Sequence, residues 1–145
     1  MSYKLEGGCA HIRTHSDHAP IDNHVCHGAA TQRITGQASA HVAFFNHDDL
    51  VVDNIDLVER QPFDVEDASN PLVFATCRTC NAPIMIGDKL GRVRGLIPAL
   101  MGYDASFPAP TYHANKGSDA SAPACDDGLP VHVGLRPDFV WPPAM

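Results

Sequence analysis

The chain has 145 residues, 44% of them hydrophobic and 19% charged, with a formal net charge of −7 at pH 7. This length and balance indicate one soluble folded domain over residues 1–145, long enough to enclose a hydrophobic core. The negative charge and the lack of a Lys/Arg-rich run argue against nucleic acid as a partner, because phosphate binding draws on clustered basic side chains. No apolar stretch approaches the length of a membrane span, so no membrane partner is expected.

Cysteine, proline and glycine usage set the expected compartment and fold class. The five cysteines are an odd number, which suits metal binding or catalysis in a reducing cytoplasm better than a set of disulfides. Residues 1–8 contain no apolar core of a signal peptide, so we expect a cytoplasmic protein. Twelve prolines and eleven glycines interrupt most windows of helical length, which favours a mainly β fold with many loops and few short helices.

The first candidate ligands, Cys9 and His11, follow the flexible pair Gly7-Gly8. In an extended strand the two side chains would point to the same face, because side chains alternate with period 2. Both residue types are good zinc ligands. Taken alone, the pair also fits a buried cysteine beside a surface histidine. Metal ligation is favoured because a second cysteine pair, Cys77 and Cys80, follows further along the chain. The polar residues from 14 to 20 predict a solvated loop rather than a second metal site.

Residues 24–36 predict one short helix that ends at Gly36. Cys26 is the only cysteine of this segment and lies between His24 and His27. The thiol is then either a small buried hydrophobe or a reactive group. The neighbouring histidines would favour its thiolate form only if they lie close and are protonated.

The middle of the chain reads as short strands. Residues 40–45 and 49–58 have strand-like apolar content, the second as two short strands with a turn at 52–55, and the acidic stretch 59–70 predicts a solvated loop.

A C-x-x-C turn, Cys77 to Cys80, separates two further apolar runs. Two cysteines at this spacing can place both thiolates on one metal ion. Asn81 tolerates the positive φ that the chain needs in order to turn back, and Pro83 prevents a helix from following. A thioredoxin-like dithiol lies at the start of a helix, so a redox pair is the less favoured alternative.

The last third is rich in loops. A strand is expected in 92–100, interrupted at Pro98, then an extended segment at 107–113 and a final strand at 131–135. Cys125 lies beside Asp126 and Asp127, whose charges would raise the pKa of a thiol, so we expect a structural or incidental role for it.

Five short motifs occur in a fixed order along most of the chain. They are Gly8-Cys9-Ala10-His11, Cys26 to Thr31 with Thr35-Gly36, Cys77-Arg78-Thr79-Cys80-Asn81, Pro110-Thr111-Tyr112-His113, and Asp127-Gly128-Leu129-Pro130. In order and spacing they resemble the glutathione-dependent formaldehyde-activating enzyme family, also called the centromere protein V-like family. The resemblance implies a zinc-stabilised β-tent fold of several small antiparallel sheets and two zinc sites.

The resemblance assigns the structural zinc site to four residues: Cys9, His11, Cys77 and Cys80. His11 stands where the family has a cysteine and remains a competent ligand, which gives a Cys₃His site.

The family's catalytic zinc site is changed in this sequence. Of its C-x-C-x-x-C motif only Cys26 is retained, while Gly28 and Thr31 occupy the other two positions. Catalytic zinc normally has three protein ligands, so one structural zinc is expected and Cys26 is the only remaining catalytic candidate. His24 or His27 is the possible substitute ligand, although His27 would point away from Cys26 in an extended segment.

These residues predict a zinc-binding protein with a degenerate catalytic site, whose cleft binds glutathione, a small thiol adduct or a protein partner. The alternative is an active carbon–sulfur lyase on a glutathione–aldehyde adduct, with a histidine-substituted second zinc site. A metal-free redox protein that uses Cys77 and Cys80 is a third reading. The sequence makes no prediction of the oligomeric state.

Overall fold

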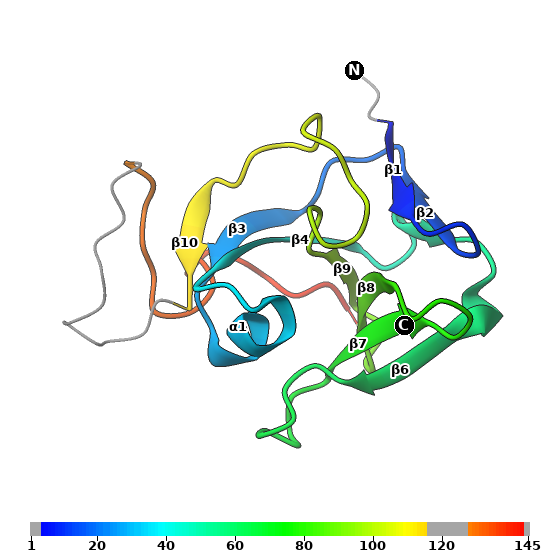
Figure 1. Ribbon diagram of the computed structural model, residues 1–145. Helices are drawn as coiled ribbons and strands as arrows, with labels where there is room; N and C mark the ends of the chain where they lie inside the picture. The colour runs from blue at the N-terminus through cyan, green and yellow to red at the C-terminus, as the bar shows by residue number, and fades with distance from the viewer. Residues whose placement is uncertain (1–3, 116–127, 144–145) are drawn as a thin grey trace.

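The computed structural model describes residues 4–115 and 128–143, and in this part of the chain ten strands form two sheets beside one α-helix (Figure 1). The strands are β1 Leu5–Gly8, β2 Arg13–Ser16, β3 Asp22–Cys26, β4 Ala40–Asn46, β5 Val51–Val52, β6 Val58–Pro62, β7 Leu72–Cys77, β8 Pro83–Asp88, β9 Val93–Leu96 and β10 Tyr112–Ala114. The helix α1 spans Ala29–Thr35, and a 3₁₀ turn, η1, spans Ile55–Leu57. The predicted mainly β fold is confirmed.

The strands divide unequally between the two sheets. The smaller sheet has the order β1-β2-β5, and the larger has the order β10-β3-β4-β9-β8-β7-β6. Neighbouring strands are antiparallel except for β10 and β3, which are parallel. The observed arrangement is therefore one large and one small sheet, where the sequence predicts several small antiparallel ones.

The core lies on both faces of the large sheet. Residues 42–45 of β4 are all buried, as are residues 84–86 of β8. Because successive side chains of a strand point to opposite faces, runs of buried residues mean that both faces are covered. Each large apolar side chain buried in this way stabilises the fold by about 1.5–3 kcal/mol.

The short helix α1 has the predicted end. Gly36 adopts the left-handed conformation, with φ of 69°, and its N–H donates to the Gln32 carbonyl at 2.9 Å. Ala30 and Thr31 are the buried residues of the helix, and α1 packs against β4. The helix thereby sets Thr31 close to the end of β3.

The C-terminal segment, residues 129–143, crosses from one end of the large sheet toward the other. Its Arg136 pairs with Asp22 of β3, while Trp141 contacts Phe44 of β4 and Arg92 after β8. Figure 1 shows this segment, coloured orange to red, running from beside β10 toward β7 and β8. It forms a wall over the sheet near the end of β3.

Several local expectations are wrong. His15 lies in strand β2 and not in a loop. The strand pairs with β1 on one side and β5 on the other, and its alternate side chains Thr14 and Ser16 are buried. The predicted loop from 59 to 70 contributes strand β6, whose polar side chains face solvent on the exposed edge of the sheet. The strand expected at 131–135 is reduced to one isolated bridge between Val131 and His113. None of the described helices is both long enough and apolar enough to cross a membrane.

Candidate functional site

Cys9 and His11 lie in the turn that joins β1 to β2, and not in a strand as expected. Gly8 has a φ of 103°, and a β-carbon built on it would collide with the Ile12 carbonyl. The Cys9 N–H donates to the same carbonyl at 2.9 Å, and the N–H groups of His11 and Ile12 donate to the Cys9 sulfur at 3.4 Å each. The tight turn, rather than strand alternation, brings the two side chains to one side.

Cys77 and Cys80 lie in the turn between β7 and β8. The Cys77 N–H donates to the Ala82 carbonyl and the Asn81 N–H donates to the Cys77 carbonyl, each at 2.8 Å. Asn81 has a φ of 63°, which confirms the expected left-handed position after the second cysteine. No helix follows, so the setting differs from that of a thioredoxin-like dithiol.

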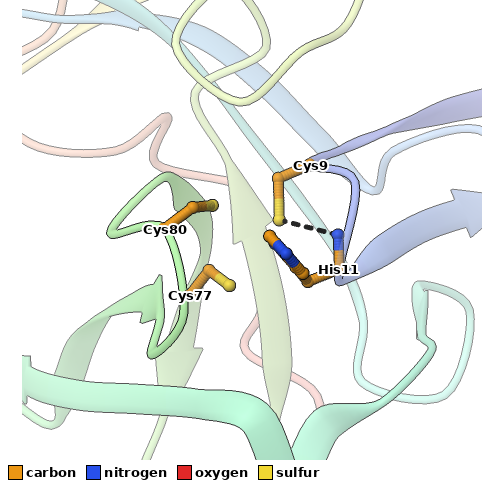
Figure 2. A group of neighbouring side chains, drawn as sticks. All are labelled: Cys9, His11, Cys77 and Cys80. Atoms are coloured by element: carbon orange, nitrogen blue, oxygen red, sulfur yellow. Dashed lines mark hydrogen bonds between the residues drawn. The ribbon is translucent and has the colours of Figure 1, made fainter.

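The two turns face each other. Figure 2 shows the side chains of Cys9 and His11 pointing toward those of Cys77 and Cys80. Their candidate ligand atoms all lie within 4.8 Å of one another. Cys77 is buried, Cys9 is half-buried, and His11 and Cys80 are exposed. The four residues that the sequence nominates for a metal site are therefore brought together from two sheets.

Backbone groups favour the charged form of one of these thiols. Desolvation raises the pKa of Cys77, but the N–H groups of Cys80 and Thr79 outweigh it and lower that pKa to about 7. A lowered thiol pKa suits a metal ligand, because the thiolate is the form that binds.

The cluster fits a zinc ion in residue type and spacing. Three sulfurs and one imidazole form a Cys₃His set, and tetrahedral zinc with bonds of about 2.3 Å holds its ligand atoms about 3.8 Å apart. Contraction of the four side chains by a fraction of an ångström would meet this requirement. Among the residues that the structure describes, no other group of three or more Cys, His, Asp or Glu side chains is close enough to hold a metal ion.

A second constellation surrounds Cys26. The alternating residues Asp22, His24 and Cys26 of β3 are all buried and share one face of the strand. Nδ1 of His24 lies 2.7 Å from Oδ2 of Asp22, and Cys26 is the next side chain on the same face of the strand. Asp22 also accepts hydrogen bonds from the Tyr112 hydroxyl, at 2.8 and 2.9 Å, and from Nε of Arg136, at 2.9 Å.

The hydrogen bonds around Cys26 favour its thiolate. Thr31 Oγ1 lies 3.0 Å from the sulfur, and Asn115 Nδ2 donates to it at 3.4 Å. Burial raises the pKa of Cys26, but hydrogen bonds from His24, Thr31, Asn115 and the Gly28 N–H outweigh it and lower that pKa to about 7.

The pKa values of His24 and Asp22 are also shifted toward the charged forms of these groups. Burial lowers the pKa of His24, but hydrogen bonds to Asp22 and Cys26 reverse the effect and raise it above its ordinary value. Burial raises the pKa of Asp22, but hydrogen bonds from His24 and Tyr112 hold it below its usual range. All three pKa shifts therefore favour the charged forms relative to the ordinary behaviour of these groups.

Cys26 opens onto a cavity of about 470 Å³. Its wall combines apolar and aromatic side chains with a similar share of polar ones. Thr31, Phe44, Arg92, Asn115, Leu135 and Trp141 are among the lining residues. The guanidinium of Arg92 lies 4.2 Å from the Trp141 ring centroid and is held by Asp88, at 2.8 Å from Nε. A cavity that combines apolar contact with convergent polar groups can hold a small molecule.

The other residues predicted for this region are placed differently. His27 turns away from Cys26, and its Nε2 lies 2.9 Å from Nδ1 of His113. Gly28 and Thr31, the positions where the family has cysteines, both adjoin the Cys26 sulfur. Cys125 lies outside the described residues. Cys9, Cys26, Cys77 and Cys80 form no disulfide.

Sequence reasoning missed most partners of Cys26. The alternation of Asp22, His24 and Cys26 is visible in the sequence, and a strand prediction for 22–26 would have placed them on one face. The contacts from Tyr112, Asn115 and Arg136 span about 90 to 114 positions along the chain, and no local pattern marks them.

Comparison with known proteins agrees with the geometry of the metal cluster. A search of curated proteins finds no match. The sequence profile described as glutathione-dependent formaldehyde-activating enzyme matches residues 3–117, which cover both the Cys/His cluster and the Cys26 row. The chain therefore belongs to the glutathione-dependent formaldehyde-activating enzyme family.

Proposed function

We propose that the protein is a zinc-binding member of this family with one structural zinc and a repurposed second site. Cys9, His11, Cys77 and Cys80 would hold the zinc, and the cavity at Cys26 would bind glutathione or a small thiol adduct. The observation that carries the proposal is the convergence of three thiols and one imidazole in a single cluster.

A structural role for the metal follows from the ligand count and the position. Four protein ligands fill a tetrahedral shell and leave no position for a substrate. The ligands come from the β1–β2 turn and the β7–β8 turn, which belong to different sheets. A bound zinc would fasten the small sheet to the large one, and its binding energy would become folding energy.

The cavity supports binding of a small molecule. Its volume of about 470 Å³ lies within the range of roughly 300–1,000 Å³ that is usual for ligand sites. Trp141, Phe44 and Leu135 offer apolar contact, while Asn115 and Thr31 offer hydrogen bonds close to the Cys26 sulfur. Membership of the family supports glutathione or a related thiol as the first ligand to test.

The alternative is a carbon–sulfur lyase with a second zinc held by His24 and Cys26. One observation favours it: a carboxylate behind a histidine, as Asp22 lies behind His24, is usual for metal-binding histidines. Among the described residues, His24 and Cys26 are the two donors at this site, and a catalytic zinc normally has three protein ligands.

Metal content per chain tests the proposal, on protein purified without a histidine tag. One zinc is expected in the parent protein and in Cys26→Ser, and less than one in Cys77→Ser. Two zincs in the parent, one of them lost in Cys26→Ser, would establish the second site instead. No zinc in the parent after exposure to zinc would refute a structural zinc. A lyase assay with S-hydroxymethylglutathione should show no turnover above that of Cys26→Ser.

A further inference from the structure

Asp22, His24 and Cys26 form a row on one face of β3 that ends at the cavity. Asp22 and His24 are buried, and Nδ1 of His24 bonds to the aspartate at 2.7 Å. Nε2 is then the ring nitrogen left to act on Cys26, which is the next side chain on the same strand face and lines the same cavity as His24. An orienting carboxylate, an imidazole base and a nucleophile in this order form the triad arrangement that unrelated hydrolases share.

We propose that Cys26 is a metal-independent nucleophile that accepts an acyl group from a small activated ester or thioester in the cavity, with His24 as its base and Asp22 as the positioning residue. The inference rests on the proposed function, because it assigns chemistry to the same small-molecule cavity.

The donor set around Cys26 suits this reaction better than it suits a second zinc. Gly28 has no side chain, and the neutral hydroxyl of Thr31 is a poor zinc ligand. The Asp22 carboxylate accepts hydrogen bonds from Tyr112 and Arg136 as well as from His24, so it is committed to holding the imidazole.

The proposed step needs only the ester and water. His24 Nε2 takes the thiol proton, and the sulfur electron pair forms a bond to the carbonyl carbon while the C=O π pair moves to oxygen. When this pair returns, the bond to the leaving alcohol or thiol breaks, and the leaving group receives the proton from His24. Water, deprotonated by His24, then attacks the acyl carbon, the carbon–sulfur bond breaks, and the acid leaves while the sulfur regains its proton from His24.

Two neutral donors are available to the oxygen that becomes negative in this step. The Asn115 amide donates to the Cys26 sulfur at 3.4 Å, and the Gly28 N–H lowers the pKa of the same thiol. A carbon bonded to that sulfur would carry its oxygen into the reach of the same donors, which is the role of an oxyanion hole. Asn115 has a φ of 56°, and its exposed position allows it to be changed without disturbing the core.

The charges around the row bear on the pH dependence. From β4, His41 has its pKa lowered to about 4 by burial and by the charge of His24, so it stays neutral near pH 7. The helix α1 contributes the neutral Thr31. Within the described part of the chain, the other charged or titratable groups nearby are Tyr112 on β10 with His132 against its ring, Arg136 in the C-terminal segment, and Asp67 and the Arg92–Asp88 pair at the cavity wall.

Acetylation by p-nitrophenyl acetate tests the proposal on the full-length, metal-bound protein. The rate is followed by intact mass between about pH 5 and pH 9, and the label is located by peptide mapping. We expect one acetyl group on Cys26, with a rate that rises with an apparent pKa of about 7. Addition of one equivalent of zinc should leave the rate unchanged.

Three variants separate the roles. His24→Gln should slow acetylation by about 100-fold or more, and its matched control His47→Gln, at a partly exposed histidine that lines a different cavity, should not. Asp22→Asn should slow it by about 10-fold and move the apparent pKa upward, a shift that mere loss of packing would not give. Asn115→Gly keeps the positive φ and should slow acetylation without changing the melting temperature. If His24→Gln fails to fold, the pH profile of the parent protein and Asn115→Gly decide the matter.

The proposal is overturned if Cys26 is not acetylated faster than the exposed Cys80, if its apparent pKa lies near the ordinary value of about 8.5, or if zinc blocks the label. Its failure is distinct from that of the proposed function. One zinc per chain with glutathione binding but no acetylation would refute only the nucleophile. A second zinc lost in Cys26→Ser would refute both.

Discussion

A β-carbon built on Gly28 would lie 3.5 Å from the Cys26 sulfur, in ordinary van der Waals contact. Gly28 has a φ of −68° and a ψ of 153°, a conformation that any residue adopts. The hydroxyl of Thr31 lies 3.0 Å from the same sulfur. The backbone therefore presents both positions, at which the family resemblance implies cysteines, to the Cys26 sulfur.

The first prediction restores these thiols. Gly28→Cys with Thr31→Cys should raise the metal content from one zinc per chain to two, because three thiolates would then converge. Cobalt substitution should add a second thiolate-to-metal absorption band. The control is Gly28→Cys with Thr35→Cys, which places the second thiol one helical turn further on, where Thr35 bonds to the Thr31 carbonyl. Equal metal content in both double variants would contradict the prediction.

The second prediction concerns stability. Cys77→Ser should lower the free energy of unfolding by about 3 kcal/mol or more, because metal-binding energy is lost, and this shifts the melting temperature by about 10 °C for a chain of this size. Cys26→Ser serves as the control and should keep its zinc. Thermal melting with and without a chelator measures the effect. A Cys77→Ser protein that melts like the parent would show that the cluster does not stabilise the fold.

The third prediction concerns the histidine ligand. His11→Cys should retain one zinc per chain, because it replaces one competent ligand by another, whereas His11→Ala leaves three ligands and should release zinc to a weaker chelator. The exposed His18, which pairs with Asp49 and lies outside the cluster, gives the matched control His18→Ala. Competition titration with a chromogenic chelator compares the affinities. Equal zinc retention by His11→Ala and His18→Ala would remove His11 from the ligand set.

The fourth prediction follows from the lowered pKa of Asp22. A carboxyl group whose pKa is lower when folded stabilises the protein above its unfolded pKa of about 3.9, and this contribution is lost as the pH falls through the folded value. Tyr112→Phe removes a donor to that carboxylate and should cost about 1.5–3 kcal/mol near neutral pH. The cost should shrink below about pH 4.

Tyr103→Phe is the control for this pH dependence. Tyr103 is also buried, but its hydroxyl bonds to the neutral Thr14 at 2.5 Å. The cost of this variant should therefore not change with pH in the acid range. Urea unfolding at several pH values measures both. Parallel pH profiles for the two tyrosine variants would contradict the role assigned to Asp22.

The fifth prediction uses the single tryptophan. Trp141 lines the cavity and contacts Phe44, with ring centroids 5.7 Å apart. Glutathione or S-methylglutathione in the cavity should therefore change the fluorescence of Trp141 in a saturable way. Trp141→Phe should abolish the signal while keeping an aromatic wall. Calorimetric binding without any change in the parent fluorescence would place the ligand elsewhere.

Local chemistry alone determined much of this protein. The proline and glycine content predicts a β-rich chain, Gly36 marks the end of α1, and the C-x-x-C with Asn81 predicts a metal-binding turn with one left-handed residue. The four candidate metal ligands were also predicted, although for a partly wrong reason. Cys9 and His11 converge through a turn that Gly8 permits, and not by alternation along a strand.

The Cys26 site was decided by the tertiary structure. A chain pattern reports which side chains share a face, but desolvation and hydrogen bonding depend on what packs against that face. Tyr112 and Arg136 reach Asp22 only because β10 pairs with β3 and the C-terminal segment crosses the sheet. The sequence therefore determined that Gly28 and Thr31 accompany Cys26, and the fold decided that the neighbouring imidazole is paired with a buried carboxylate.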